Sequence, residues 1–137
     1  MITHLLDTSA ILAHYFNSAG AGEVDTLWRD PANVIGLSAL TLVELQGRLA
    51  ATVADAAERE RIFRLYADEL AVVIAVDDAV ARFAGEFRAA APAGLPLADA
   101  VIAATARREN AVLVHRDPHF AALGATAPRQ LILPDQP

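Results

Sequence analysis

Four acidic residues stand where a carboxylate is unusual. Asp7 ends an apolar run and is followed by two hydroxyl residues in "LLDTSAIL", and Asp117 follows the apolar run "AVLVH" by two positions. Glu44 lies in the mostly apolar stretch "ALTLVELQGRL", and Asp99 is the only charged residue in "LPLADAVIAATA". Burying an ionised carboxylate without a partner is costly. Asp99 in particular therefore needs a cation or another partner.

Each acid also has a structural explanation that the sequence leaves open. Asp7 and Asp117 could cap the helices that follow them, and the proline directly after Asp117 suits a helix start. Glu44 could pair with Arg48, four residues later, on an exposed helix face. Asp99 falls in the first turn of its helix, where the helix dipole favours an acid by ~0.3–1 kcal/mol. Each acid alone is compatible with a structural role, and only the four acids considered together favour a shared site.

Taken together, the four acids predict a metal site. Clustered carboxylates repel one another unless a cation lies between them. The chain has no cysteine, so oxygen ligands dominate, and these suit the hard cations Mg²⁺ and Mn²⁺. Such cations suit phosphoryl chemistry, because one can lower the pKa of a water molecule and a second can stabilise the leaving oxygen.

Short apolar segments alternate with longer segments of helical pattern, and they indicate the elements that position the acids. We expect strands at 2–6, 33–38, 71–76, 111–115 and 130–133, and helices at 9–16, 22–30, 39–50, 54–70, 77–90 and 95–110, with a helical turn at 118–123. The segment 91–94 should end one helix and separate it from the next, and the tail 134–137 should lack regular secondary structure.

The alternation of strands and helices predicts an α/β fold with a parallel sheet and helices on both of its faces. The β-branched run at 71–76 is typical of a strand that is covered on both faces. In open α/β sheets, chemistry gathers at the carboxyl ends of the strands. Asp7 and Asp117 would therefore meet if the strands that precede them are neighbours.

Length, charge and hydropathy limit the class of protein. The 137 residues suit a single domain, 1–137. The start of the chain does not have the pattern of a signal peptide, and no apolar run approaches a membrane span, so we expect a cytoplasmic protein. The net charge of −6 does not favour nucleic-acid binding, although an acidic cluster that holds cations would also lower it.

The stretches that carry the four acids resemble the motifs of PIN-domain nucleases in their order and approximate spacing, over residues 2–133. They are "LLDTSAIL", "LTLVELQGRL", "LPLADAVIAATA" and "AVLVHRDPHF". Length and compactness are most similar to the toxin of VapBC toxin–antitoxin pairs. The resemblance implies a PIN-like three-layer sandwich with a five-stranded parallel sheet, and RNA cleavage that depends on Mg²⁺ or Mn²⁺. It also implies a homodimer and an antitoxin partner. The residues that correspond to the family's acids are Asp7, Glu44, Asp99 and Asp117, and Ser9 corresponds to its hydroxyl near the first acid.

His115 departs from the family pattern, because Ser or Thr usually stands two residues before the last acid. It could contact substrate phosphate, tune the metal or pack at the end of the strand. We expect His119, beyond the proline, to be a surface residue. Arginines suit phosphate binding, and the candidates for RNA contacts are Arg48, Arg107, Arg108 and Arg116.

Two alternative functions remain open at this point. The first is a catalytically silent PIN-like module that binds RNA or protein, although the presence of all four acids argues against it. The second is a phosphatase of the haloacid dehalogenase kind, which also begins with a strand that ends in Asp. Those enzymes require Asp-x-Asp, and Ser9 occupies the third place here.

Overall fold

A parallel sheet forms the centre of the protein. In the computed structural model, which describes residues 1–91 and 93–135, the sheet has five strands in the order β3-β2-β1-β4-β5. Their bounds are β1 His4–Leu6, β2 Ile35–Ser38, β3 Val72–Ile74, β4 Val112–His115 and β5 Gln130–Ile132. Every neighbouring pair is parallel, and β1 lies between β2 and β4. The carboxyl ends of β1 and β4 are therefore adjacent.

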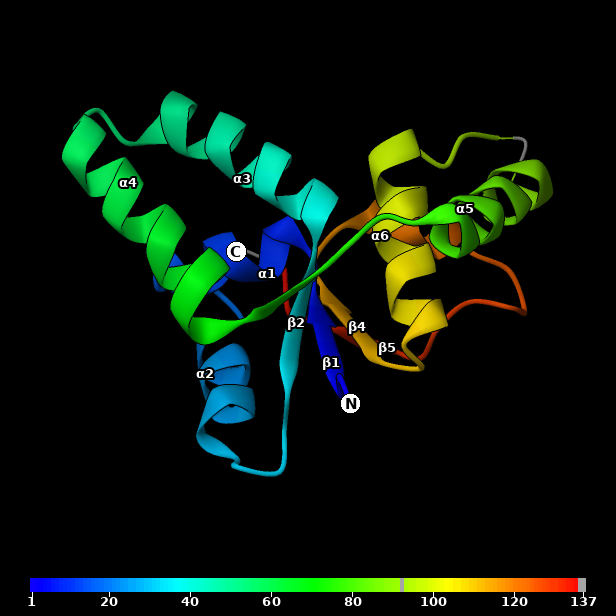
Figure 1. Cartoon of the computed structure of the whole chain (residues 1–137), viewed down its shortest axis with the longest axis horizontal. Helices are drawn as coiled ribbons and strands as arrows, with labels where there is room; N and C mark the ends of the chain where they lie inside the picture. The colour runs from blue at the N-terminus through cyan, green and yellow to red at the C-terminus, as the bar shows by residue number, and fades with distance from the viewer. Residues whose placement is uncertain (92, 136–137) are drawn as a thin grey trace.

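Helices cover both faces of this sheet (Figure 1). Those on one face are α1 Thr8–Tyr15, α2 Ala21–Arg29, α3 Ala39–Thr52 and α4 Ala56–Arg64, which continues into the π-helical turn η1 Leu65–Leu70. Those on the other face are α5 Asp78–Ala90 and α6 Leu97–Arg108. The 3₁₀ turn η2 Pro118–Ala122 follows β4. The predicted three-layer α/β fold with a five-stranded parallel sheet is confirmed.

The core has two apolar layers, one on each side of the sheet. Leu5 and Leu113 pack with residues of α5 and α6, whereas Leu6 and Val114 pack with residues of α1, α2, α3 and α4. Successive side chains of a strand point to opposite faces. A strand with a helical layer on each side is therefore apolar at nearly every position, as the central strands are.

The segment at 71–76 differs from its prediction. Its strand, β3, is the edge of the sheet and spans three residues, and Val72 and Val73 are 52% and 37% exposed. The prediction that this strand is covered on both faces is wrong. A β-branched run suits a pleated, half-buried surface and does not distinguish an edge strand from a central one.

The helix predicted at 54–70 also differs in its second half. The α-helix ends at Arg64, and a wider π-helical turn continues to Leu70. Within that turn Tyr66 is buried, and its hydroxyl lies 2.7 Å from His14 Nδ1. Two other expectations reach beyond the described residues: the break at 91–94 includes Pro92, and the tail includes 136–137. Among the described residues, no helix is long and apolar enough to cross a membrane.

Candidate functional site

Asp7 occupies the junction between β1 and α1. Its backbone N–H donates to Val114 O at 2.9 Å, so this junction is fixed to the neighbouring strand β4. Its side chain caps α1 by accepting the backbone N–H of Ser9 at 3.2 Å. The capping explanation of Asp7 is therefore correct, and it does not exclude a further role, because the carboxylate also lines a hollow described below.

Ser9 links Asp7 to the chain that follows β4. Its hydroxyl donates to Asp7 Oδ2 at 2.6 Å and accepts the backbone N–H of Arg116 at 2.9 Å. One hydroxyl thus joins the segments that carry Asp7 and Asp117. The predicted proximity of these two acids follows from strand order and from this bridge.

Glu44 lies on α3, which Ser38 caps at its N-terminus. Glu44 Oε1 accepts a hydrogen bond from the hydroxyl of Thr8 at 2.8 Å, whereas Arg48 forms no ion pair with it among the described residues. Sequence reasoning assigned no role to Thr8. Its burial, which only the structure shows, explains the contact, because a buried hydroxyl requires a partner.

Asp99 lies in the first turn of α6 and is 6% exposed. Its pKa is raised from 3.8 to about 7, chiefly by burial and in addition by the negative charges of Asp117 and Asp7. Burial likewise raises the pKa of Asp7 to about 6, although the two hydrogen bonds from Ser9 oppose that rise. Both carboxyls are therefore held in a setting that disfavours their ionised forms unless a cation is present.

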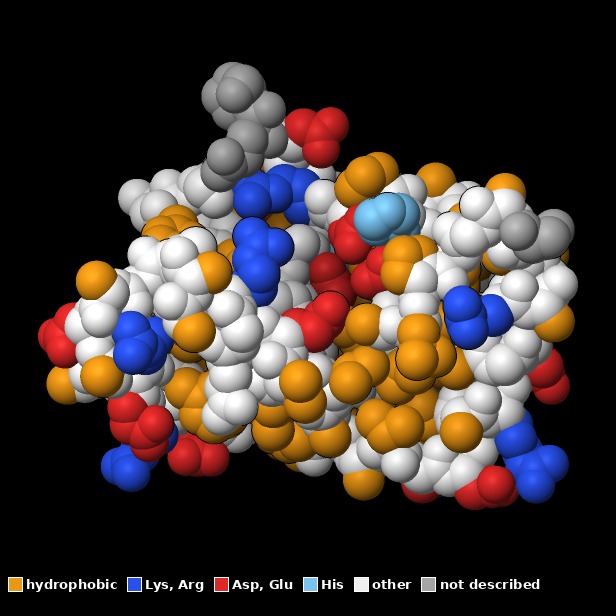
Figure 2. All heavy atoms as spheres, turned by 90° about the horizontal axis from the view of Figure 1, so that it is seen from above, with side chains coloured by type: hydrophobic (Ala, Val, Ile, Leu, Met, Phe, Trp, Pro, Cys, Tyr) orange, Lys and Arg blue, Asp and Glu red, His pale blue; other side chains and the backbone are white. Residues whose placement is uncertain are grey.

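All four acids line one hollow of about 720 Å³ at the carboxyl end of the sheet. Figure 2, which views the molecule from that end, shows acidic side chains gathered in the centre with basic ones beside them. The basic residues in the lining are Arg48 and Arg116. The acids come from α3, α6 and the ends of β1 and β4, so only the tertiary fold brings them together.

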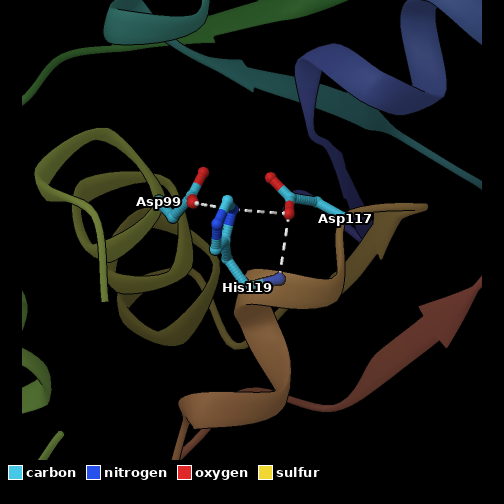
Figure 3. A group of neighbouring side chains, drawn as sticks. All are labelled: Asp99, Asp117 and His119. Atoms are coloured by element: carbon cyan, nitrogen blue, oxygen red, sulfur yellow. Dashed lines mark hydrogen bonds and ion pairs between the residues drawn. The ribbon is translucent and has the colours of Figure 1, made fainter. Parts of the chain in front are cut away.

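His119 also belongs to this site. Its Nδ1 lies 2.9 Å from Asp117 Oδ1 and 3.4 Å from Asp99 Oδ2. Figure 3 shows the imidazole between the two carboxylates, with Asp99 coming from α6 and the other two residues from the turn after β4. The side chain is 58% exposed, so His119 is a surface residue as expected, and its ring also faces the two acids.

The family of the chain follows from its sequence match. The model of the PIN domain matches residues 4–125. The chain belongs to the PIN domain family. This membership sets aside the haloacid dehalogenase alternative. No curated protein matches the sequence significantly.

Solved structures with the same fold include toxin–antitoxin proteins. VapBC2 from Rickettsia felis, solved with a DNA fragment from its promoter, is 18% identical with a TM-score of 0.76, covering 97% of this chain and 100% of that one. VapBC-5 from Mycobacterium tuberculosis is 25% identical with a TM-score of 0.70, covering 96% and 98%. VapC20 from Mycobacterium tuberculosis, a sarcin–ricin-loop-cleaving toxin, is 20% identical with a TM-score of 0.69, covering 88% and 94%.

His115, which departs from the PIN pattern, is buried at the end of β4. Its Nδ1 accepts the backbone N–H of Asp117 at 3.1 Å, so Nε2 carries the proton and donates to Gln130 Oε1 at 2.8 Å. The ring also packs on Phe120, with centroids 4.5 Å apart. Both nitrogens are thus engaged away from the carboxylates, and this geometry favours the packing alternative, in which His115 positions Asp117.

We expect His115→Thr, which restores the residue usual in PIN nucleases, to lower stability by about 1–3 kcal/mol, because it removes buried hydrogen bonds and ring packing. The ratio of rates in Mg²⁺ and Mn²⁺ should stay within about threefold, since an energy of ~1.4 kcal/mol at the metal would change it tenfold. Thermal melts and rates in both metals measure these effects. A tenfold change in that ratio with unchanged stability would contradict the packing role.

The remaining arginine candidates lie apart from the hollow. Arg107 and Arg108 stand at the C-terminal end of α6, whereas Asp99 is in its first turn. Arg107 Nε donates to Thr126 O, and Arg108 pairs with Asp77 at 2.9 Å. These two residues therefore stabilise the surroundings of α6, and neither lines the hollow that holds the acids.

Proposed function

We propose that this protein is a metal-dependent endoribonuclease and the toxin of a VapBC-type toxin–antitoxin pair. The observation that carries the proposal is that four carboxylates from separate elements line one hollow, where two of them have a raised pKa. Membership of the PIN domain family, whose members are nucleases, supports the same conclusion. Cleavage of cellular RNA would place the protein in the cytoplasm.

The residues present fit a divalent cation. The donors are carboxylate oxygens, which hard cations prefer, and their mutual repulsion is relieved by positive charge. Asp7, Glu44 and Asp99 would hold one Mg²⁺ or Mn²⁺, directly or through water, and Asp117 would support that ion or a second one. When bound, the cation supplies an activated water and neutralises charge on the phosphodiester.

Other residues of the chain orient the acids and the substrate. Ser9 fixes one oxygen of Asp7, and Thr8 fixes one oxygen of Glu44, so both carboxylates are held in place before a ligand arrives. Arg48 and Arg116 line the same hollow and would bind RNA phosphates. The backbone N–H of Arg116 donates to the hydroxyl of Ser9, which itself donates to Asp7. The proposed phosphate-binding residue Arg116 is therefore held next to the carboxylate of Asp7.

The toxin role implies partners. VapBC structures hold toxin and antitoxin, and we propose a cognate antitoxin for this chain on that basis. We also propose a homodimer. Large apolar side chains that face solvent support further interfaces, among them Val43 on α3 and Leu97 on α6, which are 66% and 62% exposed.

We expect the purified protein to cleave RNA with Mg²⁺ or Mn²⁺ and to stop in EDTA, because negatively charged carboxylates cannot neutralise the charge of a phosphodiester without a cation. A panel of structured and single-stranded RNAs, including a sarcin–ricin loop, provides the substrates, and gel analysis measures cleavage. Glu44→Gln should lose at least about a hundredfold in rate, an energy of ~2.7 kcal/mol. The matched control, Glu23→Gln, changes an exposed acid of α2 that does not line the hollow, and it should keep the parent rate.

Cleavage that continues undiminished in EDTA would contradict the metal mechanism. Cleavage by Glu44→Gln at the rate of Glu23→Gln would remove Glu44 from the site. Tight RNA binding without metal-stimulated cleavage across the panel would instead support the silent binding module.

A further inference from the structure

The position of His119 has a consequence for metal choice that goes beyond the four acids. Asp117 caps the turn η2 by accepting the backbone N–H of His119 at 2.9 Å, and the imidazole of His119 folds back over the same carboxylate. One ring nitrogen and one oxygen each from Asp99 and Asp117 lie within 4.8 Å of one another. Figure 3 shows these three side chains converging from α6 and η2.

The two distances from the imidazole nitrogen are compatible with neighbouring ligands on one ion. Ligands at about 2.1 Å from an octahedral ion, at right angles to each other, lie roughly 3.0 Å apart. His119 Nδ1 lies 2.9 Å and 3.4 Å from its two carboxylate partners. One imidazole N–H makes a linear hydrogen bond to only one oxygen, so the second oxygen receives at best a weaker, bifurcated contact. A cation between the nitrogen and the oxygens would contact all three atoms directly.

We propose that His119 Nδ1 is a metal ligand, and that with Asp99 and Asp117 it forms a mixed nitrogen–oxygen site that selects Mn²⁺ over Mg²⁺. This inference rests on the proposed function, since it concerns the cation of that site. Imidazole nitrogen suits transition metals, whereas Mg²⁺ is held by carboxylates, phosphates and water. The acids alone would bind either ion, and the imidazole adds the preference.

The two histidines near Asp117 have different roles. The buried His115 uses both ring nitrogens on protein partners, so it has no nitrogen to offer an ion. His119 is 58% exposed, and among the described residues its ring forms ion pairs only with the two acids. Replacing His119 should therefore leave the fold intact, and this makes the inference testable by substitution.

The test uses the full-length protein loaded with Mn²⁺ and examined by electron spin echo spectroscopy, which detects a nitrogen nucleus bonded to the ion. The parent should show nitrogen modulation, and His119→Ala should lose it. By calorimetry, His119→Ala should bind Mn²⁺ about tenfold more weakly and Mg²⁺ within about twofold of the parent. His4→Ala is the control, because His4 lies on β1 with its Nδ1 near Thr3. It should behave as the parent, and melts verify that both variants are folded.

Nitrogen modulation that persists in His119→Ala, or an equal loss of Mg²⁺ and Mn²⁺ affinity, would overturn the inference. So would a parent that binds Mn²⁺ without nitrogen modulation. If that parent still cleaves RNA in a metal-dependent manner, the proposed function stands while the role of His119 falls. If modulation depends on His119 but no RNA in the panel is cleaved, the metal site stands and the nuclease proposal falls.

Discussion

Asp99→Asn should abolish RNA cleavage and at the same time stabilise the metal-free protein. Asn keeps the shape of the side chain but cannot ionise, so it removes one charge from a cluster of like charges. The rise in the pKa of Asp99 from 3.8 to about 7 corresponds to at most about 4 kcal/mol of unfavourable free energy when the carboxyl ionises. We expect Asn to recover about 1–3 kcal/mol of this at pH 8, and cleavage to fall at least about a hundredfold.

The gain in stability should depend on pH. The folded protein binds a proton at Asp99 more tightly than the unfolded chain does, so the parent loses stability as pH rises from about 4 to about 7. Asp7, with its pKa raised to about 6, adds to this loss over the lower part of the window. Asp99→Asn should therefore match the parent near pH 4 and exceed it at pH 8. Denaturant melts in EDTA across this range measure the difference.

Asp78→Asn is the matched control for Asp99→Asn. Asp78 also lies in the first turn of a helix, α5, but it is exposed, and its one ion pair within residues 1–91 and 93–135 is with Arg82. Its replacement reports the helix-dipole contribution and should cost a few tenths of a kcal/mol with no change in cleavage. An Asp99→Asn protein that is active and slightly less stable, like Asp78→Asn, would mean that Asp99 only complements its helix.

Divalent metal should raise the thermal stability of the parent strongly. Binding to the folded state alone contributes ~2.7 kcal/mol at a hundredfold excess over the dissociation constant. For a chain of this length that corresponds to a rise of roughly 8–10 °C in Tm. Melts with Mn²⁺, with Mg²⁺ and with EDTA measure it, and Ca²⁺ tests for nonspecific effects of a divalent charge.

The stabilisation by metal should be larger at pH 8 than at pH 5. Below their raised pKa values of about 6 and about 7, Asp7 and Asp99 must first release protons, and that competition weakens metal binding. Asp99→Asn should gain less from the metal than the parent does. An unchanged Tm of the parent at millimolar Mn²⁺ and pH 8 would show that the acids do not bind an ion together.

Much of this fold could be predicted from the sequence, because the central strands and the helices beside them have periodic apolar patterns. The parallel sheet followed from short apolar strands that alternate with helices. The exposure of Val72 and Val73 could not be predicted, since strand order depends on long-range packing rather than on local composition. The π-helical turn after Arg64 also has no local signal in the sequence.

The candidate site shows the same division. Glu44 and Asp99 could be predicted because each is a charge in an apolar stretch, and Asp7 and Asp117 because each follows an apolar strand at the edge where chemistry gathers. Thr8 and His119 were missed because their residue types are ordinary at those positions. Their roles depend on contacts across the fold, between Thr8 and Glu44 and between His119 and Asp99.

The most direct test of the central claim is anomalous diffraction from crystals of the full-length protein grown with Mn²⁺. We predict an anomalous peak in the hollow lined by Asp7, Glu44, Asp99 and Asp117, with carboxylate oxygens at about 2.1–2.3 Å from the ion. The Asp99→Asn variant, crystallised in the same way, should show a weaker peak or none there. The crystals should be grown at a Mn²⁺ concentration that supports RNA cleavage. A hollow with ordered carboxylates but no manganese under these conditions would contradict the account.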